Sequence, residues 1–350
     1  MLNNPSPSNG TVHTPRPLIR SATLSGYMEL VTSLGRDPLM FLQAVGLSPK
    51  LLENSETLVP RDAARELLEI TARATKVEDF ALRLAARRRL SALGPISLVL
   101  KEEPTPRHAL NTLCRYLKLV NPSLILNVED AGGTVIIREG LLPSPGLAMR
   151  QSVELAVGTM YRMLSDLAGE QWRPREVCFS HRPTADLSAY RAFFGATIKF
   201  NQEFDGLVCD AMELDKPRAS GDQLAANYAR KFLETALTHR KASTQDSCYQ
   251  MILAVLPGGG CSAQEVARLM GVDRRTLHRH LEAEGLSYSQ LLDLVRSDLV
   301  KRHLRESDLP LNEVAELLGF SRPSSLSHWF QAKFSCTASQ WRLQNKPMAS

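Results

Sequence analysis

The sequence has few cysteines, and none of them forms a metal-binding pattern. Its six cysteines are scattered over 350 residues, without a C-x-x-C motif or a cluster with histidine. Structural zinc sites need closely spaced ligands, and a disulfide framework needs a denser pattern than this. We therefore expect reduced thiols, and neither a metal ion nor a cofactor.

Long apolar runs are missing as well. No stretch approaches the roughly 18 apolar residues that a membrane-spanning helix needs. The first twenty residues contain four prolines and lack the apolar core of a signal peptide, so residues 1–20 are predicted to form a flexible tail. From these two absences we expect a cytoplasmic protein without a membrane partner.

A strong excess of either charge is also absent. The chain carries 42 Lys+Arg and 37 Asp+Glu, a net charge of +5. Residues 251–350 contain 12 Lys+Arg and 10 Asp+Glu, so the charge is not concentrated there. This balance is compatible with a polyanionic partner but does not require one. Any nucleic-acid-binding site must therefore be recognised from local patterns.

Residues 21–215 combine helical and strand-like patterns. Apolar residues recur at three- and four-residue spacing in 61–75 and 150–169, which is typical of amphipathic helices. Two β-branched runs in 123–139 flank "DAGG" (130–133) and predict a hairpin. Because the order of elements lacks a βαβ alternation, we expect an α+β domain rather than a nucleotide-binding sheet.

A polar segment with Pro and Gly, at 215–222, marks the end of this domain. A helix is predicted after it, from about Gln223 to Arg240. We expect residues 216–243 to form a connector and residues 244–345 to form a second, all-α domain.

Two segments of this second domain are copies of one unit. The segment "EVARLMGVDRRTLHRHL" (265–281) realigns on "EVAELLGFSRPSSLSHWF" (313–330) with a one-residue insertion. Each copy has the pattern of a helix-turn-helix: a short helix, a Gly-centred turn and a second helix. In the first copy, Ser262 and Glu265 are predicted to form a capping box at the start of the first helix. Gly271 is predicted to end that helix, and Asp273 to cap the start of the second.

The second helix of the first copy has an apolar face and a basic face. Leu277 and Leu281 share one side of this helix, at about 100° per residue. The opposite side carries Arg275, His278, Arg279 and Glu282, with Arg274 beside them. A basic face on an isolated helix is more often merely solvated. A helix that packs on the protein through its leucines and carries arginines near its start nevertheless fits the DNA major groove. The presence of a second copy of the unit favours this DNA-binding interpretation.

The second copy has polar side chains at the matching outward positions, Ser324, Ser327 and His328. Arg322 precedes the helix, where a phosphate would lie, and Pro323 suits the first turn. Between the copies, residues 287–304 predict one helix of roughly 27 Å. Such a helix would hold two recognition helices on two short DNA boxes roughly 10 bp apart.

With these motifs, the last hundred residues resemble the AraC/XylS family of transcriptional regulators. The resemblance lies in "VARLMGVDRRTLHRHLEAEGLSYSQLLDLVRSDLVKRHL" and "LNEVAELLGFSRPSSLSHWFQAKFSCTASQWR". Ser335 and Ala338 depart from the Gly and Pro that the family usually has before its last helix. The resemblance implies a sequence-specific regulator, an activator by family habit, that works with RNA polymerase. The base-reading positions that it carries over are Arg275, His278, Arg279, Ser324, Ser327 and His328.

Residues 21–215 resemble the arabinose-binding-like N-terminal domain found in ornithine-utilisation regulators and their relatives within this family. The segments that carry the resemblance are "GYMELVTSLGRDP", "RRLSALGPISLVL", "RYLKLVNPSLIL", "WRPREVCFSH" and "AYRAFFGATIKFNQEFDGLV". The resemblance implies a regulatory domain for a small effector, which need not be a sugar, and a homodimer formed through this domain.

Three consecutive arginines, Arg87, Arg88 and Arg89, are predicted to lie late in a helix that begins near Glu78. Charge complementarity with the helix dipole is one explanation for them. The other is that one of them holds a carboxylate-bearing effector through a bidentate contact. The sequence leaves both explanations open.

Two other functions fit parts of the sequence. The pattern Gly258-x-Gly260-x-x-Ala263 follows an apolar run and imitates a dinucleotide fingerprint, but Pro257 interrupts the junction and no second parallel strand follows. No Walker A, G-x-S-x-G or H-E-x-x-H pattern occurs, so we do not expect an enzyme. A protein-interaction adaptor would use the same helices without DNA.

Overall fold

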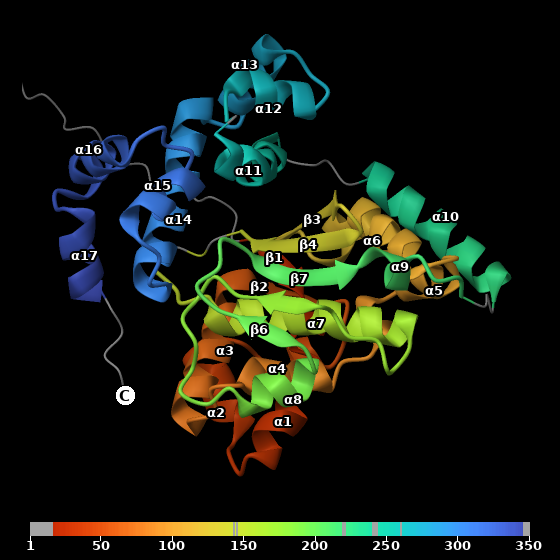
Figure 1. Ribbon diagram of the computed structural model, residues 1–350. Helices are drawn as coiled ribbons and strands as arrows, with labels where there is room; N and C mark the ends of the chain where they lie inside the picture. The colour runs from red at the N-terminus through yellow and green to blue at the C-terminus, as the bar shows by residue number, and fades with distance from the viewer. Residues whose placement is uncertain are drawn as a thin grey trace, which may run out of the picture.

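The computed structural model describes residues 17–142, 144, 146–218, 222–239, 244–259 and 261–345. The N-terminal part combines two sheets with helices, and the part from Thr244 onward is a group of helices (Figure 1). The predicted fold class, α+β followed by all-α, is therefore confirmed. Residues 1–16 of the predicted tail and residues 219–221 and 240–243 of the predicted connector lie outside the described residues.

A five-stranded sheet forms the centre of the N-terminal part. Its strand order is β3-β4-β7-β5-β6, and all neighbours are antiparallel except β5 and β6. The strands are β3 (Leu124–Ala131), β4 (Thr134–Leu141), β5 (Glu176–Cys178), β6 (Thr197–Lys199) and β7 (Asp205–Asp210). The predicted hairpin is confirmed as β3 and β4, and its turn uses Gly132 and Gly133 at φ 55° and 84°, which glycine adopts without strain.

Helices pack on this sheet and build the larger apolar core. The helices that contribute to it are α5 (Ile96–Glu102), α6 (Pro106–Val120), α7 (Arg150–Ala168), α8 (Ser188–Phe194), α9 (Ala211–Leu214) and α10 (Gln223–His239). A second core is formed by α1 (Tyr27–Ser33), α2 (Pro38–Ala44), α3 (Arg61–Thr75), α4 (Phe80–Ala86) and the paired strands β1 (Leu18–Arg20) and β2 (Leu58–Pro60). Helix α7 joins the two cores, since Leu155 packs in the second and Val157 in the first.

Strand β1 shortens the tail that the sequence predicted. Leu18–Arg20 pair with β2 instead of continuing the flexible segment through residue 20. Ile19 is buried, and the Arg20 guanidinium forms an ion pair with Glu56 and donates to the Leu93 main-chain oxygen. The tail predicted from the proline-rich composition was therefore too long. The partners that hold residues 18–20 are far away in the sequence, and composition carries no information about them.

The C-terminal helices have an apolar core of their own. They are α11 (Thr244–Val255), α12 (Ala263–Leu269), α13 (Arg274–Ala283), α14 (Tyr288–Glu306), α15 (Leu311–Leu317), α16 (Pro323–Phe334) and α17 (Ala338–Asn345). The buried members of this core run from Cys248 to Ala338 and include none from the N-terminal part. The two halves of the chain are thus packed around separate cores.

The end of α14 docks on the N-terminal sheet. Arg302 forms a buried ion pair of 2.5 Å with Asp205 at the start of β7. Arg182, which follows β5, donates to the main-chain oxygens of Arg305 (2.8 Å) and Ser307 (2.7 Å) at the end of α14. A cation in this place satisfies carbonyl groups that have no partner within the helix and complements the helix dipole. These contacts fix α14 against the N-terminal part.

Candidate nucleic-acid interface and effector cavity

The first helix-turn-helix consists of α12, a turn and α13. Ser262 caps α12 by accepting from the Glu265 main-chain N–H (3.1 Å), and Gly271 has a φ of 69°. Asp273 caps α13 by accepting from the Thr276 main-chain N–H (2.8 Å). The predicted boundaries are confirmed, but only half of the capping box forms, because the Glu265 carboxylate pairs with Arg268 instead.

Helix α13 separates an apolar face from a basic face. Leu277 and Leu281 are completely buried in the C-terminal core. Arg274, Arg275 and Arg279 are exposed, and His278 is half-buried. None of the three arginines has an ion-pair or hydrogen-bond partner among the residues that the structure describes. Their guanidinium groups are therefore available to a ligand outside the chain.

The second helix-turn-helix consists of α15, a turn and α16. Gly319 sits in the turn at a φ of 65°, and a Cβ atom there would lie 2.8 Å from the Leu256 main-chain oxygen, so only glycine fits. Leu326 and Phe330 anchor α16 in the core. The outward positions Arg322, Ser324, Ser327 and His328 are exposed. Pro323 is in the first turn of α16, as predicted.

Helix α14 connects the two units as a single helix, which confirms the predicted linker. Its 19 residues correspond to a length of about 28 Å. The Arg296 guanidinium lies 4.3 Å from the centre of the Phe320 ring and donates to the Leu318 main-chain oxygen (3.0 Å). Arg296 thus ties the turn of the second unit to α14. This contact could not be predicted from the sequence, because its partners are more than twenty residues away.

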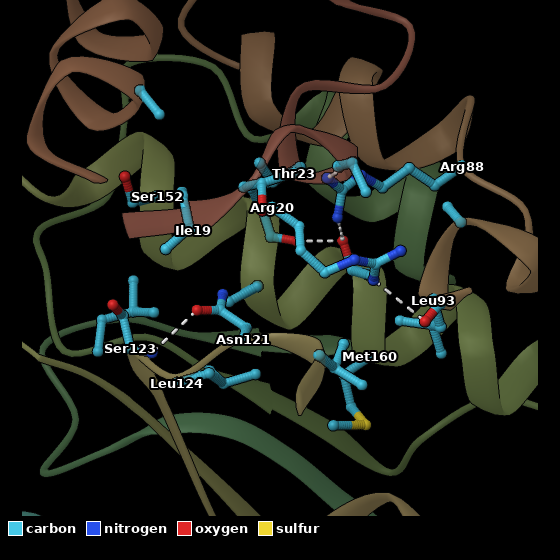
Figure 2. A pocket seen from close by; sticks show the side chains of 18 of the residues that line it. Ile19, Arg20, Thr23, Arg88, Leu93, Asn121, Ser123, Leu124, Ser152 and Met160 are labelled. Carbon is cyan, nitrogen blue, oxygen red and sulfur yellow. Dashed lines mark hydrogen bonds between the residues drawn. The ribbon is translucent and has the colours of Figure 1, made fainter. Parts of the chain in front are cut away.

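A cavity of about 110 Å³ lies within the N-terminal part (Figure 2). Arg88 and Leu93 stand on one side of it, and Asn121, Ser123 and Leu124 on the other. Its apolar walls come chiefly from α3, α6 and α7. Five arginines line it, and its only acidic residue among those described is Glu139; the arginines are Arg20, Arg61, Arg65, Arg88 and Arg89.

The predicted arginine cluster reaches this cavity only in part. Helix α4 ends at Ala86, so the three arginines follow the helix instead of lying in its last turn, which corrects the predicted element. The chain turns there so that Leu90 can be buried in the first core. Arg88 and Arg89 line the cavity, whereas Arg87 lies outside it and donates to Ser33.

Arg88 is a partly buried cation without an acidic partner in the described part of the chain. Its guanidinium donates to Thr159 Oγ1 (3.1 Å) and to the Ala22 main-chain oxygen (2.8 Å), and its Nε has no partner. Burial, with the charge of Arg20 as a second cause, lowers the pKa of Arg88 to about 10. An anion that entered the cavity would be attracted by this uncompensated charge.

Glu139 is the unpaired acid of the cavity wall. It is 7% exposed, and neither of its carboxylate oxygens has a hydrogen-bond partner among the described residues. Burial and the charge of Asp205, which stands opposite it in the pairing of β4 with β7, raise the pKa of Glu139 to about 8. Asp205 accepts from the Ser180 main-chain N–H (2.7 Å) and pairs with Arg302. One pair of strands therefore separates the cavity from α14.

Several of these cavity residues were missed from the sequence. One signal was present: Arg61 and Arg65 interrupt the apolar stripe of the predicted helix 61–75, on the side that carries Ala64 and Leu68, and both are buried. A charge on the buried side of an amphipathic helix requires a partner or a ligand. Glu139 gave a similar signal, because it takes an inward position of β4 between the buried Ile137 and Leu141.

Other predicted features can be placed as well. The apolar run before Gly258 is helix α11 rather than a strand, so the dinucleotide pattern lacks its strand, and Gly260 lies outside the described residues. Within the described ranges, no three or more His, Cys, Asp or Glu side chains gather as a metal site would require. In the same ranges, no helix combines the length and apolar character needed to cross a membrane.

Comparison with known proteins matches both halves of the chain to the same kind of protein. Residues 35–218 match the arabinose-binding domain of AraC transcription regulators, N-terminal, and residues 266–344 match a helix-turn-helix domain. The HTH-type transcriptional regulator VirS of Mycobacterium tuberculosis is 31% identical over 327 residues, which are 93% of this chain and 96% of VirS.

Two relatives from Pseudomonas aeruginosa show the same similarity at lower identity. The ornithine utilization regulator is 26% identical, covering 71% of this chain and 74% of its own. The HTH-type transcriptional regulator VqsM is 24% identical, covering 71% and 79%. The chain therefore belongs to the AraC family of transcriptional regulators, with an N-terminal ligand-binding domain and a C-terminal helix-turn-helix domain that binds DNA.

Proposed function

We propose that this regulator reads DNA bases through α13 and α16. The proposed base-reading residues are Arg275, His278, Arg279, Ser324, Ser327 and His328, and the proposed phosphate contacts are Arg274 and Arg322. The observation that carries this proposal is the contrast on α13, where arginines without partners face outward and leucines on the other side are completely buried. An arginine so placed can donate two parallel hydrogen bonds to guanine.

The two units should read two boxes on one face of the duplex. Both are attached to α14, whose length of about 28 Å is close to the roughly 34 Å between successive major grooves. The boxes differ in sequence, because the two copies carry different outward side chains. The first box contributes more affinity, since arginine makes charge-assisted contacts that serine cannot make.

We further propose that the protein acts in the cytoplasm, where chromosomal DNA and RNA polymerase are accessible, and that it activates transcription. The family membership supports an activating role, and one more relative, matched over 23% of this chain, is named as the urease operon transcriptional activator of Escherichia coli. The same membership supports a regulator without enzymatic activity.

We propose that the arginine-lined cavity binds the effector and that the effector carries a carboxylate. Arg88 supports this, because a guanidinium that is partly buried without an acidic partner costs free energy, and an anionic ligand would offset that cost. The apolar walls suit a hydrocarbon body. Aliphatic monocarboxylates are suitable first probes, whereas ornithine, for which one relative is named, carries two ammonium groups that the arginines would repel.

We also propose that the effector acts on α14 through Glu139 and Asp205. With its raised pKa, Glu139 is mostly protonated at neutral pH, and Asp205 then holds Arg302 without a competing charge beside it. A ligand that ionises or displaces the Glu139 carboxyl changes the electrostatic field at Asp205. The strength with which the N-terminal sheet holds α14 then changes too.

Replacing Arg275 or Arg279 by Ala should weaken binding to the specific site by about 1–3 kcal/mol each, because each change removes a bidentate base contact. Binding to random DNA should change much less. Mobility-shift titrations with a selected site and a scrambled one measure both affinities. Arg83→Ala is the control, an exposed arginine on α4 that pairs with Asp79. Equal losses on both DNAs would show that the two arginines contact phosphates only.

Adding about 5 bp between the two boxes should sharply reduce affinity. The insertion turns the second box by half a turn, and a single rigid helix can follow it only if the DNA bends at a cost of several kcal/mol. A spacer of the original length with altered bases is the control, and fluorescence anisotropy measures the three affinities. If the insertion leaves affinity unchanged, only one of the two units engages DNA.

Replacing Arg88 by Met should weaken binding of a carboxylate effector by about 1.5–3 kcal/mol, the usual contribution of a hydrogen bond to a charged group. Isothermal titration calorimetry measures this affinity, and the amide analogue of the same ligand should bind the unaltered protein similarly weakly. Arg87→Met is the matched control, because Arg87 lies outside the cavity. Undiminished binding by the Arg88 variant would remove the carboxylate proposal.

Replacing Asp205 by Asn should loosen the end of α14, because it leaves Arg302 with only the longer ion pair to Glu306 (3.7 Å) and costs up to about 3 kcal/mol locally. Hydrogen exchange of the amides in 300–306 should become faster, and the effect of effector on transcription should be lost. Asp210→Asn is the control, since Asp210 ends the same strand and pairs with Arg175, away from α14. Unchanged exchange, together with a normal effector response, would contradict the proposed coupling.

A further inference from the structure

A second cavity lies where the two halves of the chain meet. Its volume is about 330 Å³, which is within the usual range of small-molecule sites. One wall comes from residues between β4 and α7, and the other comes from α14 and α17, which lie side by side in the C-terminal part (Figure 1). Gly146 and Asn345 on its lining are exposed, so the cavity opens to solvent. We refer to it as the junction cavity.

The wall formed by α14 is basic. Four charged side chains line it at three- and four-residue spacing, which places them along one side of the helix: Asp298, Lys301, Arg302 and Arg305. Arg302 is neutralised by its ion pair with Asp205. Arg305 pairs with Glu306 (3.0 Å) and donates to the Leu147 main-chain oxygen. Both arginines are therefore already occupied by groups of the protein.

Lys301 is the cation of this wall that is available to a ligand. Its ammonium nitrogen lies 4.9 Å from the centre of the Phe334 ring, and no acidic group of the described residues is within ion-pair distance of it. Asp298, the only acidic residue among the described lining residues, is one helical turn away and is outnumbered by the three cations on the same side of α14. An anionic group in the cavity would thus meet Lys301 without displacing an existing partner.

Trp341 of α17 gives the junction cavity an aromatic surface. Its ring is half-buried and packs edge-on against Phe330, with the ring centroids 6.5 Å apart. Its indole N–H has no hydrogen-bond partner among the described residues. Leu147, Met149 and Leu299 add apolar surface. A flat ring can stack against such a lining, and the indole N–H can donate to a polar group of the same ligand.

We propose that the junction cavity binds an organic monoanion that combines a flat aromatic ring with one carboxylate. Lys301 pairs with the carboxylate, and the ring lies against Trp341. A single negative charge fits, because a second one would have to compete with Asp205 or Glu306 for the arginines. The aromatic ring distinguishes this ligand from the hydrocarbon body that suits the arginine-lined cavity.

The two cavities share a wall, so their ligands would influence each other. Leu141 lines both cavities. Arg65 of the arginine-lined cavity donates to the hydroxyl of Ser144 in the junction cavity (2.6 Å), and this hydroxyl donates in turn to Asp62 (2.5 Å). Since the walls of the junction cavity belong to both halves, a ligand there would also favour their docked arrangement. The mutual influence rests on the proposed effector cavity, whereas the junction site itself does not.

Isothermal titration calorimetry with 2-naphthoate, a flat aromatic monocarboxylate, tests the site in the full-length protein without DNA. The unaltered chain should bind it, and the uncharged 2-naphthamide should bind about tenfold more weakly. Lys301→Met should lose about the same factor for 2-naphthoate, and Lys301→Arg, which keeps the charge, should recover most of it. Trp341→Leu should weaken both naphthalene ligands. Lys216→Met is the matched control, since Lys216 pairs with Glu213 and is not part of the lining.

Octanoate, an aliphatic monocarboxylate, separates this site from the arginine-lined cavity. Arg88→Met should weaken octanoate and leave 2-naphthoate unchanged, and Lys301→Met should do the reverse, with circular dichroism melting to confirm that both variants fold. The proposal is overturned if 2-naphthoate binds the unaltered chain more weakly than about 1 mM. It is equally overturned if 2-naphthoate binding survives Lys301→Met or is lost in Arg88→Met instead. If octanoate alone fails to bind, the proposed effector is wrong and the junction site stands.

Discussion

The buried ion pair between Arg302 and Asp205 is the contact on which the arrangement of the two halves depends. Removing two charges from water is costly, and the attraction between them offsets that cost only when the geometry is good and further hydrogen bonds satisfy the remaining atoms. Asp205 meets this condition, since it also accepts from the main-chain N–H and the hydroxyl of Ser180 (2.7 and 3.0 Å). An ion pair of this kind is specific about position, because a small displacement weakens the attraction between two charges that are largely shielded from water. Helix α14 is thereby held in one place on the sheet.

Both DNA-binding units are positioned from that helix. Near its start, the Tyr288 hydroxyl donates to the Cys261 main-chain oxygen (3.2 Å), which precedes the first unit. In its middle, Arg296 holds the turn of the second unit, and Asp293 accepts from the Trp329 indole N–H (3.1 Å) of α16. Since α13 and α16 are attached to different parts of one rigid helix, their separation is set by α14 and not by the loops between them.

The features that could be predicted from the sequence are those with local causes. The hairpin and the caps at Ser262 and Asp273 depend on residues within a few positions of one another. The repeat could be recognised because each of its copies is a local pattern of this kind. The features that could not be predicted depend on contacts distant in sequence. Arg20 joins a strand because Glu56 and Leu93 hold its side chain, and Arg296 meets Phe320 across the core. Composition and periodicity carry no information about such pairs.

The cavity shows the same limit most clearly, because its residues come from elements far apart in the sequence. Its arginines come from β1, α3 and the segment after α4, so its positive charge exists only when these separate elements are packed together. An anion bound there would favour the packed arrangement over any loosened one, by the general rule that a ligand stabilises the state that binds it. Because Glu139 of the same cavity stands opposite Asp205, that stabilisation includes the strand pair that holds Arg302. The charges that make the cavity costly in the absence of a ligand are thus connected, through one pair of strands, to the helix that positions both DNA-binding units.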